Sequence, residues 1–426
     1  MSTAKRIVFI GAAGEMCRVA IQRFAEAVEG ADWKLELYDI RPEVLDDLVE
    51  LLPSGSVSVG SFDLFDGVAL TSAIEGAALV VLGAGPYIRT AEPVRAACID
   101  NKVAYLDLDD DEASTRAALV LDAAARAAEV PIFVGCGASP GLTNVMAVDA
   151  ARDMDSVDRI DVCWVTGDEG AVPFGRAVLD HAIRGFAGQC QTWEHGRPAT
   201  HQTFVETDVF ALGDSFGAAY RLYECAHPEA VTMPRRWPQA DRIRVLGAID
   251  PPPVNGVMRG VALAVQSGQI SMDQAIDFVN DVMTDKTGSP AVWRHALSGL
   301  WGMIRRREIG AGEVLKYLAA AALRKHPDYR GITYVRVTGK RNGEQVVSIR
   351  RVPVSGPGTN LASMAAATGA ATAAFMVLAL EEIGQRSGVL APEDWANPEK
   401  FYEVLARVGH AQLPAIIESV VVRAPQ

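Results

Sequence analysis

The sequence lacks the cysteine pairs that stabilise many secreted proteins or hold a structural metal. Its six cysteines stand singly, without a Cys-x-x-Cys pair and without regular spacing to a histidine. We therefore expect no disulfide framework, no metal site and a reducing, cytoplasmic setting. The chain runs from Lys5 and Arg6 directly into an apolar stretch, so no secretory signal is expected. The cysteines are Cys17, Cys98, Cys136, Cys163, Cys190 and Cys225.

Positive charge is also scarce. The 426 residues include 40 Lys and Arg against 53 Asp and Glu, which gives a net charge of −13 at pH 7. A surface that binds nucleic acid needs a basic patch, and none is evident. We expect a small-molecule substrate and no nucleic-acid partner.

One segment has the length of a membrane span. Leu361 to Leu380 contains twenty uncharged residues. It consists of Ala, Gly, Thr and Ser more than of Leu or Ile, which favours a closely packed buried helix over a membrane helix. We therefore expect no membrane partner.

The functional interpretation depends on the N-terminal stretch. Arg6 to Ile10 predicts a strand, two glycines interrupt it, and a helical pattern follows. Gly11 lets the chain leave the strand, and Gly14 lets a diphosphate approach the helix N-terminus, where free N–H groups attract an anion. Cys17 replaces the third glycine of the dinucleotide fingerprint, at a position that requires only a small residue. A purely structural turn is the alternative. The predicted cofactor contacts are Gly11, Ala13, Gly14, Glu15 and Met16.

Three further residues belong to the predicted cofactor site. The strand Lys34 to Tyr38 ends in Asp39, where a carboxylate accepts hydrogen bonds from the adenosine ribose. The Asp39 carboxylate would repel a 2′-phosphate, which favours NAD, whereas the neighbouring Arg41 guanidinium could bind one, which leaves NADP as the alternative. Asp63 either caps the next helix or contacts adenine, and the capping role is favoured.

The length of the chain predicts two domains. Strands and helices alternate through the first third of the sequence, which is typical of an α/β fold with a doubly wound parallel Rossmann sheet. Within it, Ala78 to Leu82 predicts a strand buried on both faces, and Glu92 to Asn101 predicts the following helix.

Loops that follow such strands meet at the carboxyl edge of the sheet, where open α/β sheets bind ligands. We assign the nicotinamide contact to the loop that ends in Tyr87, whose hydroxyl is a candidate catalytic donor or a packing group. Several carboxylates end the next predicted strand, and among them Asp109 is the candidate that faces the substrate. The alternative for Asp110 and Asp111 is that they begin the following helix, where the helix dipole favours negative charge. The remaining predicted contacts at this edge are Gly83, Ala84, Gly85, Pro86, Cys136 and Gly137.

From about residue 151 the pattern changes to an α+β region. Several strands predict an antiparallel sheet, with a hairpin at Arg341-Asn342-Gly343, and Val257 to Lys325 is mostly helical. Arg176 is the candidate for gripping a substrate carboxylate, and His181 for acid-base catalysis. The alternative for His181 is a packed or surface residue.

Four motifs in order resemble the saccharopine dehydrogenase family, including its carboxynorspermidine dehydrogenase-like and homospermidine synthase-like relatives. They are GAAGEMC, LGAGPY, YLDLDDD and GCGASPGLTNVMA. The block MAAATGAATAAFMVLALEEIGQRSGVLAPEDWANPEKFYEVLARVG resembles the C-terminal part of the same family.

The resemblance implies a homodimer and three regions. Residues 1–145 form the NAD(P)-binding Rossmann domain, 146–360 an inserted substrate and dimerisation domain, and 361–426 C-terminal helices that return to the first domain. One position departs from the family: its amino-acid-forming members carry an acidic residue before Pro-Gly, and this chain has Ser139, followed by Thr143 and Asn144. Ser139 alternatively caps the next helix.

The resulting prediction is an NAD(P)-dependent oxidoreductase. It would transfer hydride at a carbon–nitrogen bond or at a carbonyl or alcohol carbon of a small polar molecule. Two alternatives stay open: a lyase or transferase that uses tightly bound NAD without net redox, and a non-catalytic nucleotide-sensing protein.

Overall fold

The first sheet is parallel throughout and has seven strands in the order β15-β6-β5-β4-β1-β2-β3. The structure is a computed structural model that describes residues 5–28, 32–52, 57–167, 175–213, 216–326, 330–353, 363–411 and 418–423. The strands are β1 (Lys5–Ile10), β2 (Trp33–Tyr38), β3 (Val57–Gly60), β4 (Leu79–Leu82), β5 (Ala104–Asp107), β6 (Pro131–Phe133) and β15 (Gly388–Leu390).

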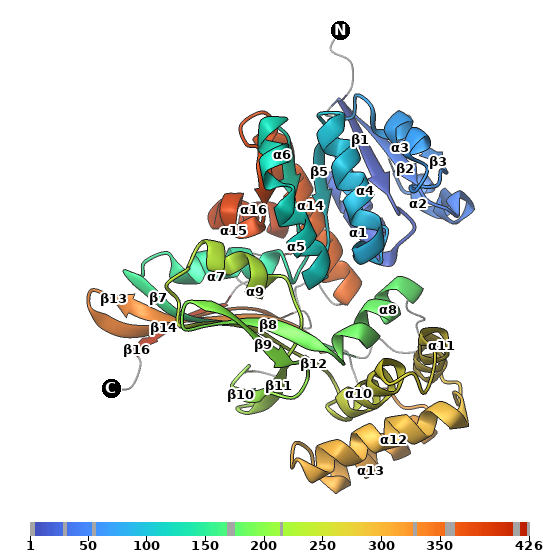
Figure 1. Ribbon diagram of the computed structural model, residues 1–426, viewed down its shortest axis with the longest axis vertical. Coiled ribbons are helices and arrows are strands. Elements are labelled where there is room, and N and C mark those ends of the chain that lie inside the picture. Colours follow the sequence, from blue (N-terminus) through green and yellow to red (C-terminus); the bar gives the residue numbers. More distant parts are fainter. Residues whose placement is uncertain are drawn as a thin grey trace.

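Helices cover both faces of this sheet (Figure 1), because alternate side chains of each strand point to opposite faces. Ile7 and Phe9 of β1 lie in the cluster that includes α1, whereas Val8 and Ile10 lie in the cluster that includes α3 and α4. The doubly wound α/β fold is confirmed. The helices are α1 (Glu15–Ala27), η1 (Pro42–Leu45), α2 (Asp46–Glu50), α3 (Gly67–Ile74), α4 (Tyr87–Asp100), α5 (Glu112–Val120) and α6 (Asp122–Ala127).

Two local predictions were wrong. The helix expected from Glu92 begins at Tyr87, because Pro86 takes the extended N-cap position and the helix continues through Pro93. Asp63 does not cap α3. Its carboxylate accepts a hydrogen bond from the Phe65 amide, while Asp66 occupies the N-cap and accepts from two amides of the first turn.

The C-terminal part of the chain returns to the first sheet, where β15 pairs with β6. Helix α14 (Met364–Glu382) is long and apolar enough to cross a membrane, but two-thirds of its most apolar window is buried. It packs on α1, and Gly369 lies against Val19 and the Met16 carbonyl. The small residues of α14 therefore allow this close approach. The segment also contains α15 (Pro392–Trp395) and α16 (Pro398–Val408).

The second sheet has the central strand order β10-β11-β12-β7-β13-β14-β16, and the hairpin of β8 and β9 pairs with β12. Its pairs are antiparallel except β7 with β12, so the sheet is mixed. The predicted hairpin is confirmed, because Asn342 and Gly343 both have positive φ. The strands are β7 (Ser156–Thr166), β8 (Gln189–Glu194), β9 (Arg197–Gln202), β10 (Thr207–Phe210), β11 (Tyr220–Glu224), β12 (Arg242–Ile249), β13 (Ile332–Arg341), β14 (Glu344–Pro353) and β16 (Glu418–Arg423).

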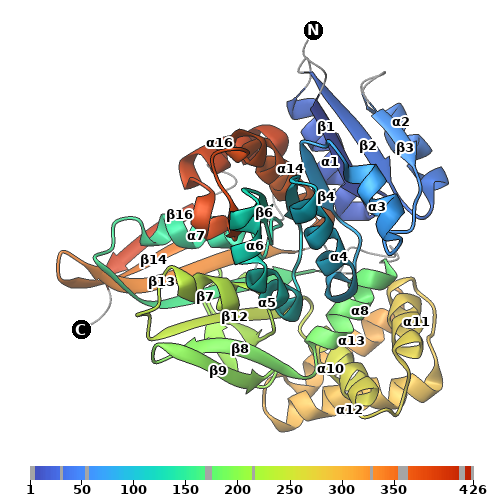
Figure 2. The ribbon, with the colours of Figure 1, turned by 45° about the horizontal axis from the view of Figure 1, so that its top comes forward.

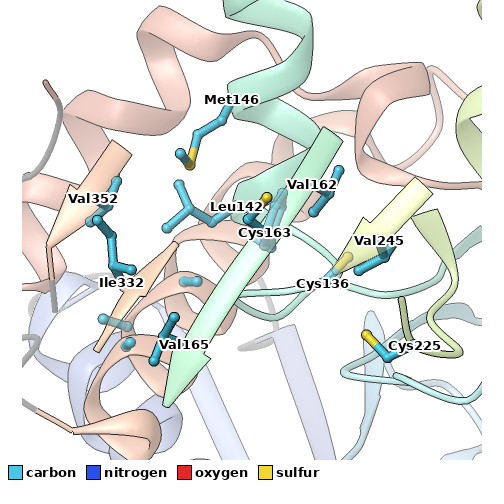
Figure 3. Packing of buried hydrophobic residues seen from close by; sticks show 14 of the residues in the cluster. Cys136, Leu142, Met146, Val162, Cys163, Val165, Cys225, Val245, Ile332 and Val352 are labelled. Atoms are coloured by element: carbon cyan, nitrogen blue, oxygen red, sulfur yellow. The ribbon is translucent and has the colours of Figure 1, made fainter. Parts of the chain in front are cut away.

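Helix α7 (Leu142–Ala151) joins the two sheets, since it follows β6 and packs on the second sheet. Figure 3 shows Leu142 and Met146 beside Cys163 and Ile332 of that sheet. The predicted boundary at residue 145 falls inside α7, and the one at residue 360 lies outside the described ranges.

A helical region lies beyond the second sheet, at the end of the molecule away from the first sheet (Figures 1 and 2). Its helices α10 and α12 cross closely because Gly260 and Gly299 have no side chain at the crossing. A Cβ on either glycine would collide with the backbone of the other helix. The remaining helices are α8 (Arg176–Gly185), α9 (Glu229–Thr232), η3 (Met233–Arg235), α10 (Pro253–Gln266), α11 (Met272–Met283), α12 (Pro290–Arg305) and α13 (Ala311–Ala322).

The contact between α1 and α14 predicts an effect of adding one methyl group. A Cβ at Gly369 would lie 2.6 Å from the Val19 Cβ and 2.7 Å from the Met16 carbonyl oxygen. We expect Gly369→Ala to lower the free energy of unfolding by about 1–3 kcal/mol, measured by urea denaturation. Gly67→Ala is the matched control, because a Cβ there has nothing within 4 Å. Equal free energies for both variants would contradict the tight packing.

Candidate functional site

The turn between β1 and α1 has the geometry that anion binding requires. Gly11 has φ +84°, and a Cβ there would lie 2.6 Å from the Ala84 Cα, so only glycine fits. Gly14 is the N-cap of α1 and gives the helix no side-chain cap. Glu15 and Met16 open the helix, with Glu15 exposed and Met16 half-buried. The amides at the start of α1 are therefore available to an anion.

Asp39 lies beside this turn, as the sequence predicts. Its carboxylate accepts hydrogen bonds from the Ala13 amide at 3.0 Å and from the Arg41 amide at 3.1 Å. Arg41 is exposed, and its guanidinium makes no ion pair within the described ranges. The carboxylate and the guanidinium thus lie next to one another at the edge of the site.

Cys17 packs α1 against the end of β4. A Cβ on Gly83 would collide with the Cys17 sulfur, so the small residue predicted at position 17 faces another small residue. Burial raises the pKa of the Cys17 thiol to about 12, so it stays protonated at neutral pH. We assign Cys17 a packing role.

The loop Gly83–Pro86 lies between this turn and α4. The Thr90 hydroxyl of α4 donates to the Ala84 carbonyl at 2.5 Å, which fixes the loop. Tyr87 begins α4, and its half-buried ring packs against the apolar cluster beneath the loop. Burial raises the pKa of Tyr87 well above its ordinary value, so its hydroxyl can donate a hydrogen bond but does not ionise near neutral pH.

Asp109 lies in the interior rather than at the protein surface. It and Asp107 are fully buried, and both accept hydrogen bonds from the Arg95 guanidinium, at 2.6 and 2.5 Å. Burial raises the pKa of Asp109 to about 7, and the neighbouring Asp107 carboxylate adds to the rise, although the Arg95 guanidinium opposes it. Asp107 also accepts from the Gly135 amide at 2.8 Å. This cluster therefore positions the loops after β5 and β6.

The neighbouring carboxylates have different roles. Asp111 is the N-cap of α5 and accepts a hydrogen bond from the Ser114 amide. This agrees with the alternative prediction that Asp111 begins a helix. Asp110 faces the other half of the molecule, where its carboxylate lies 3.4 Å from Nε2 of His181 on α8. Both side chains are about one-third exposed, at 36% and 29%. The structure thus brings His181 to the carboxyl edge of the first sheet.

Arg176 lies on the same helix but contacts different groups. Its guanidinium donates to Asp273 and Asp277 of α11, and the three side chains are exposed. Arg176 and His181 are therefore not brought together. Ala177, the next residue, lies against Gly85, so the start of α8 faces the loop after β4.

The loop from Gly135 to Gly141 folds back on itself. The Gly137 amide donates to the Pro140 carbonyl, and the Gly137 carbonyl accepts from the Leu142 amide. Cys136 is fully buried, and its carbonyl accepts from Thr372 of α14. Burial raises the pKa of the Cys136 thiol well above its ordinary value. The backbone groups of Cys136 and Gly137, both predicted cofactor contacts, thus form hydrogen bonds with other residues of the protein.

Ser139 does not cap α7. Its hydroxyl donates to Oε1 of Glu229 at 2.6 Å, and the Thr143 hydroxyl donates to the same oxygen at 2.8 Å. The Asn144 side chain accepts from the Gly141 amide instead and donates to Glu393. Position 139 therefore has no carboxylate of its own, but the carboxylate of Glu229, from the second half of the molecule, lies beside it.

His227 and Glu229 are the groups that sequence reasoning missed. Nδ1 of His227 lies 2.9 Å from Oε2 of Glu229, which is fully buried. Burial alone would lower the pKa of His227 and raise that of Glu229, but their attraction reverses both shifts. The two residues therefore form an ion pair, with Trp164 packed 5.9 Å from the imidazole. Their His-Pro-Glu order is the only local sequence signal, and it is weak.

The ion pair of His227 and Glu229 can hold a proton near the carboxyl edge of the first sheet. Glu229 fixes Nδ1 of His227, and Nε2 has no hydrogen-bond partner in the described part of the chain. The imidazole side chain is 8% exposed, and the carboxylate of Asp110 adds to the rise in its pKa. An imidazolium oriented by a buried carboxylate is suited to general acid-base chemistry.

The pair predicts a pH dependence of stability. A raised pKa of His227 stabilises the fold fully below about pH 6.5, and this contribution is lost as the pH rises through the folded value. A lowered pKa of Glu229 stabilises the fold above about pH 4.3 and is lost at lower pH. We expect His227→Gln to cost about 3 kcal/mol near pH 6 and clearly less near pH 9, measured by thermal unfolding.

His195→Gln is the control for that measurement. His195 pairs with Asp241 at the surface, where its side chain is 75% exposed. Its replacement should change stability by less than about 1 kcal/mol at either pH. A His227→Gln effect of the same size at pH 6 and pH 9 would contradict the ion pair.

Comparison with known proteins supports the fold. No protein-family model matches the sequence, and no curated protein matches it. A structure of apo histidine-tagged saccharopine dehydrogenase (L-Glu forming) from Saccharomyces cerevisiae matches with a TM-score of 0.62. The two are 15% identical, and the match covers 98% of this chain and 100% of the yeast chain. This chain therefore has the fold of the yeast enzyme over almost its whole length.

Two other solved structures are similar only in part. One is a putative oxidoreductase from Klebsiella pneumoniae, 14% identical, covering 58% of this chain and 62% of that one. The other is GenD2 from gentamicin A biosynthesis in complex with NAD, 15% identical, covering 58% and 66%. Both have a TM-score of 0.31, too low to indicate a shared overall fold.

Proposed function

We propose that this protein is an NAD(P)-dependent oxidoreductase of saccharopine dehydrogenase type. It transfers hydride at a carbon–nitrogen bond, or at a carbonyl or alcohol carbon, of a small polar molecule. The observation that carries the proposal is the turn at Gly11 and Gly14, which leads into an uncapped helix beside the Asp39 carboxylate. The shared fold with the yeast enzyme and the four sequence motifs support it.

The residues present fit a nicotinamide dinucleotide. The amides at the start of α1 would hold the pyrophosphate, and Asp39 the adenosine ribose. The loop Gly83–Pro86 would hold the nicotinamide, since its small residues leave room for a ring. The bound cofactor would supply or accept the hydride.

The chain itself supplies the groups that move protons. His227 donates from Nε2 while Glu229 keeps Nδ1 in place, and the pair of His181 and Asp110 lies at the carboxyl edge of the first sheet. Tyr87 is a hydrogen-bond donor at the start of α4 or a packing residue. Arg176 is committed to α11 and has no role in the proposed reaction.

We propose a reducing cytoplasm as the setting, which the six free and buried thiols support. The proposed partner is a small-molecule substrate, without nucleic acid and without a membrane.

The proposed reaction is tested by following the absorbance of reduced nicotinamide with panels of amines, keto acids and alcohols. A substrate-dependent change is the expected result. Product formed without any change would instead indicate the chemistry of the homospermidine-forming relatives, in which bound NAD is regenerated. If the cofactor binds but no substrate in any panel changes the absorbance or yields a product, a non-catalytic nucleotide sensor would be favoured.

Gly14→Asp tests the cofactor site while leaving the fold intact. Gly14 has the extended backbone of an N-cap, where Asp is favourable, but the new carboxylate would repel the pyrophosphate. We expect binding of NAD or NADP to weaken by about tenfold or more in calorimetric titrations. Gly310→Asp, at the N-cap of the distant helix α13, should leave binding unchanged. Absence of binding to the unmodified protein would overturn the proposal.

Asp39→Ser tests the choice between the two cofactors. Removing the carboxylate should relieve repulsion of a 2′-phosphate and leave the exposed Arg41 guanidinium to bind it. We expect the ratio of NADP to NAD affinity to rise by about tenfold or more, measured by the same titrations. Arg41→Ala should lower this ratio instead. An unchanged ratio in Asp39→Ser would place the ribose away from residue 39.

A further inference from the structure

A groove lies between helices α10 and α12, in the helical region away from the first sheet (Figures 1 and 2). Its volume is about 480 Å³, which is large enough for a small molecule. Three glycines line it, Gly260, Gly299 and Gly302, so no side chains fill it at these positions. The groove is therefore a candidate ligand site that is separate from the proposed cofactor site.

The groove carries positive charge in an acidic protein. Arg259 of α10, His295 of α12 and Arg306 at the C-cap of α12 line it, and none of the described residues that line it is acidic. Arg306 donates to the Glu308 carboxylate with Nε and Nη2. Its Nη1 lies beside Gly302, where a Cβ would be 3.1 Å away. This nitrogen is therefore a donor for a ligand in the groove.

Arg259 has no carboxylate partner. Its Nη1 donates to the Phe204 carbonyl, and it makes no ion pair within the described part of the chain. Burial lowers the pKa of Arg259, and the charge of Arg306 lowers it further, although Glu308 opposes the fall. Two guanidiniums therefore lie near one carboxylate, and one positive charge stays uncompensated.

The buried Arg244 of the second sheet differs from Arg259 in its partners. Its guanidinium contacts the carboxylates of Asp161 and Asp208, each at 2.6 Å. Burial alone would lower the pKa of Arg244, but these carboxylates raise it. A partly buried charge without such partners is unfavourable. An anion that enters the groove would remove this cost at Arg259.

We propose that the groove binds the phosphate group of a small molecule, either a phosphate ester or inorganic phosphate, through Arg259 and Arg306. Within the described residues, Nε and Nη2 of Arg259 make no hydrogen bond, and two such donors match two phosphate oxygens. Nη1 of Arg306 provides a third donor.

Apolar side chains lie beside these cations. Leu263 and Ala264 of α10 also line the groove, and Leu263 is 38% exposed. Small-molecule sites commonly combine apolar walls with a few charged groups. A phosphate ester whose organic part contacts Leu263 should therefore bind more tightly than inorganic phosphate.

Calorimetric titration of the full chain with phenyl phosphate and with inorganic phosphate tests the site. We expect phenyl phosphate to bind with a dissociation constant of about 1 mM or lower, and Arg259→Gln to raise this constant about tenfold or more. Arg305→Gln is the matched control, because Arg305 is an exposed arginine of α12 that does not line the groove. This control loses the same charge and should bind phenyl phosphate as the unmodified protein does.

Ser298→Asp tests the groove without removing the contact of Arg259 with Phe204. Ser298 is exposed and lines the groove. A carboxylate at position 298 should repel the phosphate group and compete with it for the guanidiniums, so binding should weaken about tenfold or more. Circular dichroism checks that each variant is folded.

Gly14→Asp separates this site from the proposed cofactor site. The turn before α1 also offers amides to an anion, so binding of both probes should persist in Gly14→Asp if the groove holds them. Tighter binding of phenyl phosphate than of inorganic phosphate would assign the groove to a phosphate ester, and equal binding would assign it to inorganic phosphate. Neither result depends on whether the protein binds NAD or NADP.

Three results would overturn the proposal. The unmodified protein could bind neither probe at about 10 mM. Binding could survive both Arg259→Gln and Ser298→Asp, which would place the probes outside the groove. Binding could be lost in Gly14→Asp instead, which would place them at the turn before α1.

Discussion

The buried carboxylate of Asp107 fixes the edge of the first sheet on which the candidate site is built. It accepts hydrogen bonds from the Arg95 guanidinium, the Tyr105 hydroxyl and the amides of Asp109 and Gly135. These donors come from α4, β5 and the loop after β6, so one group joins three segments. Because a buried donor without a partner costs about 1–3 kcal/mol, these loops have little freedom to rearrange.

Two helices rich in alanine illustrate how composition and environment interact. In α14 the small residues let the helix approach α1, and Gly369 lies against Val19 and the Met16 carbonyl of that helix. In α13 the same kind of residue faces outward, beside Leu315 and Leu323. Small residues permit close packing, and the neighbouring elements decide whether the partner is the same chain. The buried share of α14 thus packs against elements of the same chain.

Most of the fold could be predicted because its signals are local. Alternating strands and helices predicted the doubly wound sheet, and Asn342-Gly343 predicted the hairpin. Two local predictions were wrong because a nearby residue could take the predicted role. Asp66, not Asp63, caps α3, and α4 begins at Tyr87 because proline at position 86 suits an N-cap. The parallel pairing of β7 with β12 joins strands whose first residues are 86 positions apart, and no local pattern encodes it.

The sequence by itself determined the turn at Gly11 and Gly14, the carboxylate after β2 and the helix that follows. Backbone freedom and helix capping depend on a few adjacent residues, so the order of amino acids is enough. Only the tertiary structure decided which polar groups of the two halves of the molecule contact each other. The contact of Ser139 with Glu229 spans 90 residues and that of Asp110 with His181 spans 71. Arg176 contacts α11 for the same reason: long-range pairs form where the fold brings opposite charges together, and sequence spacing does not record that distance.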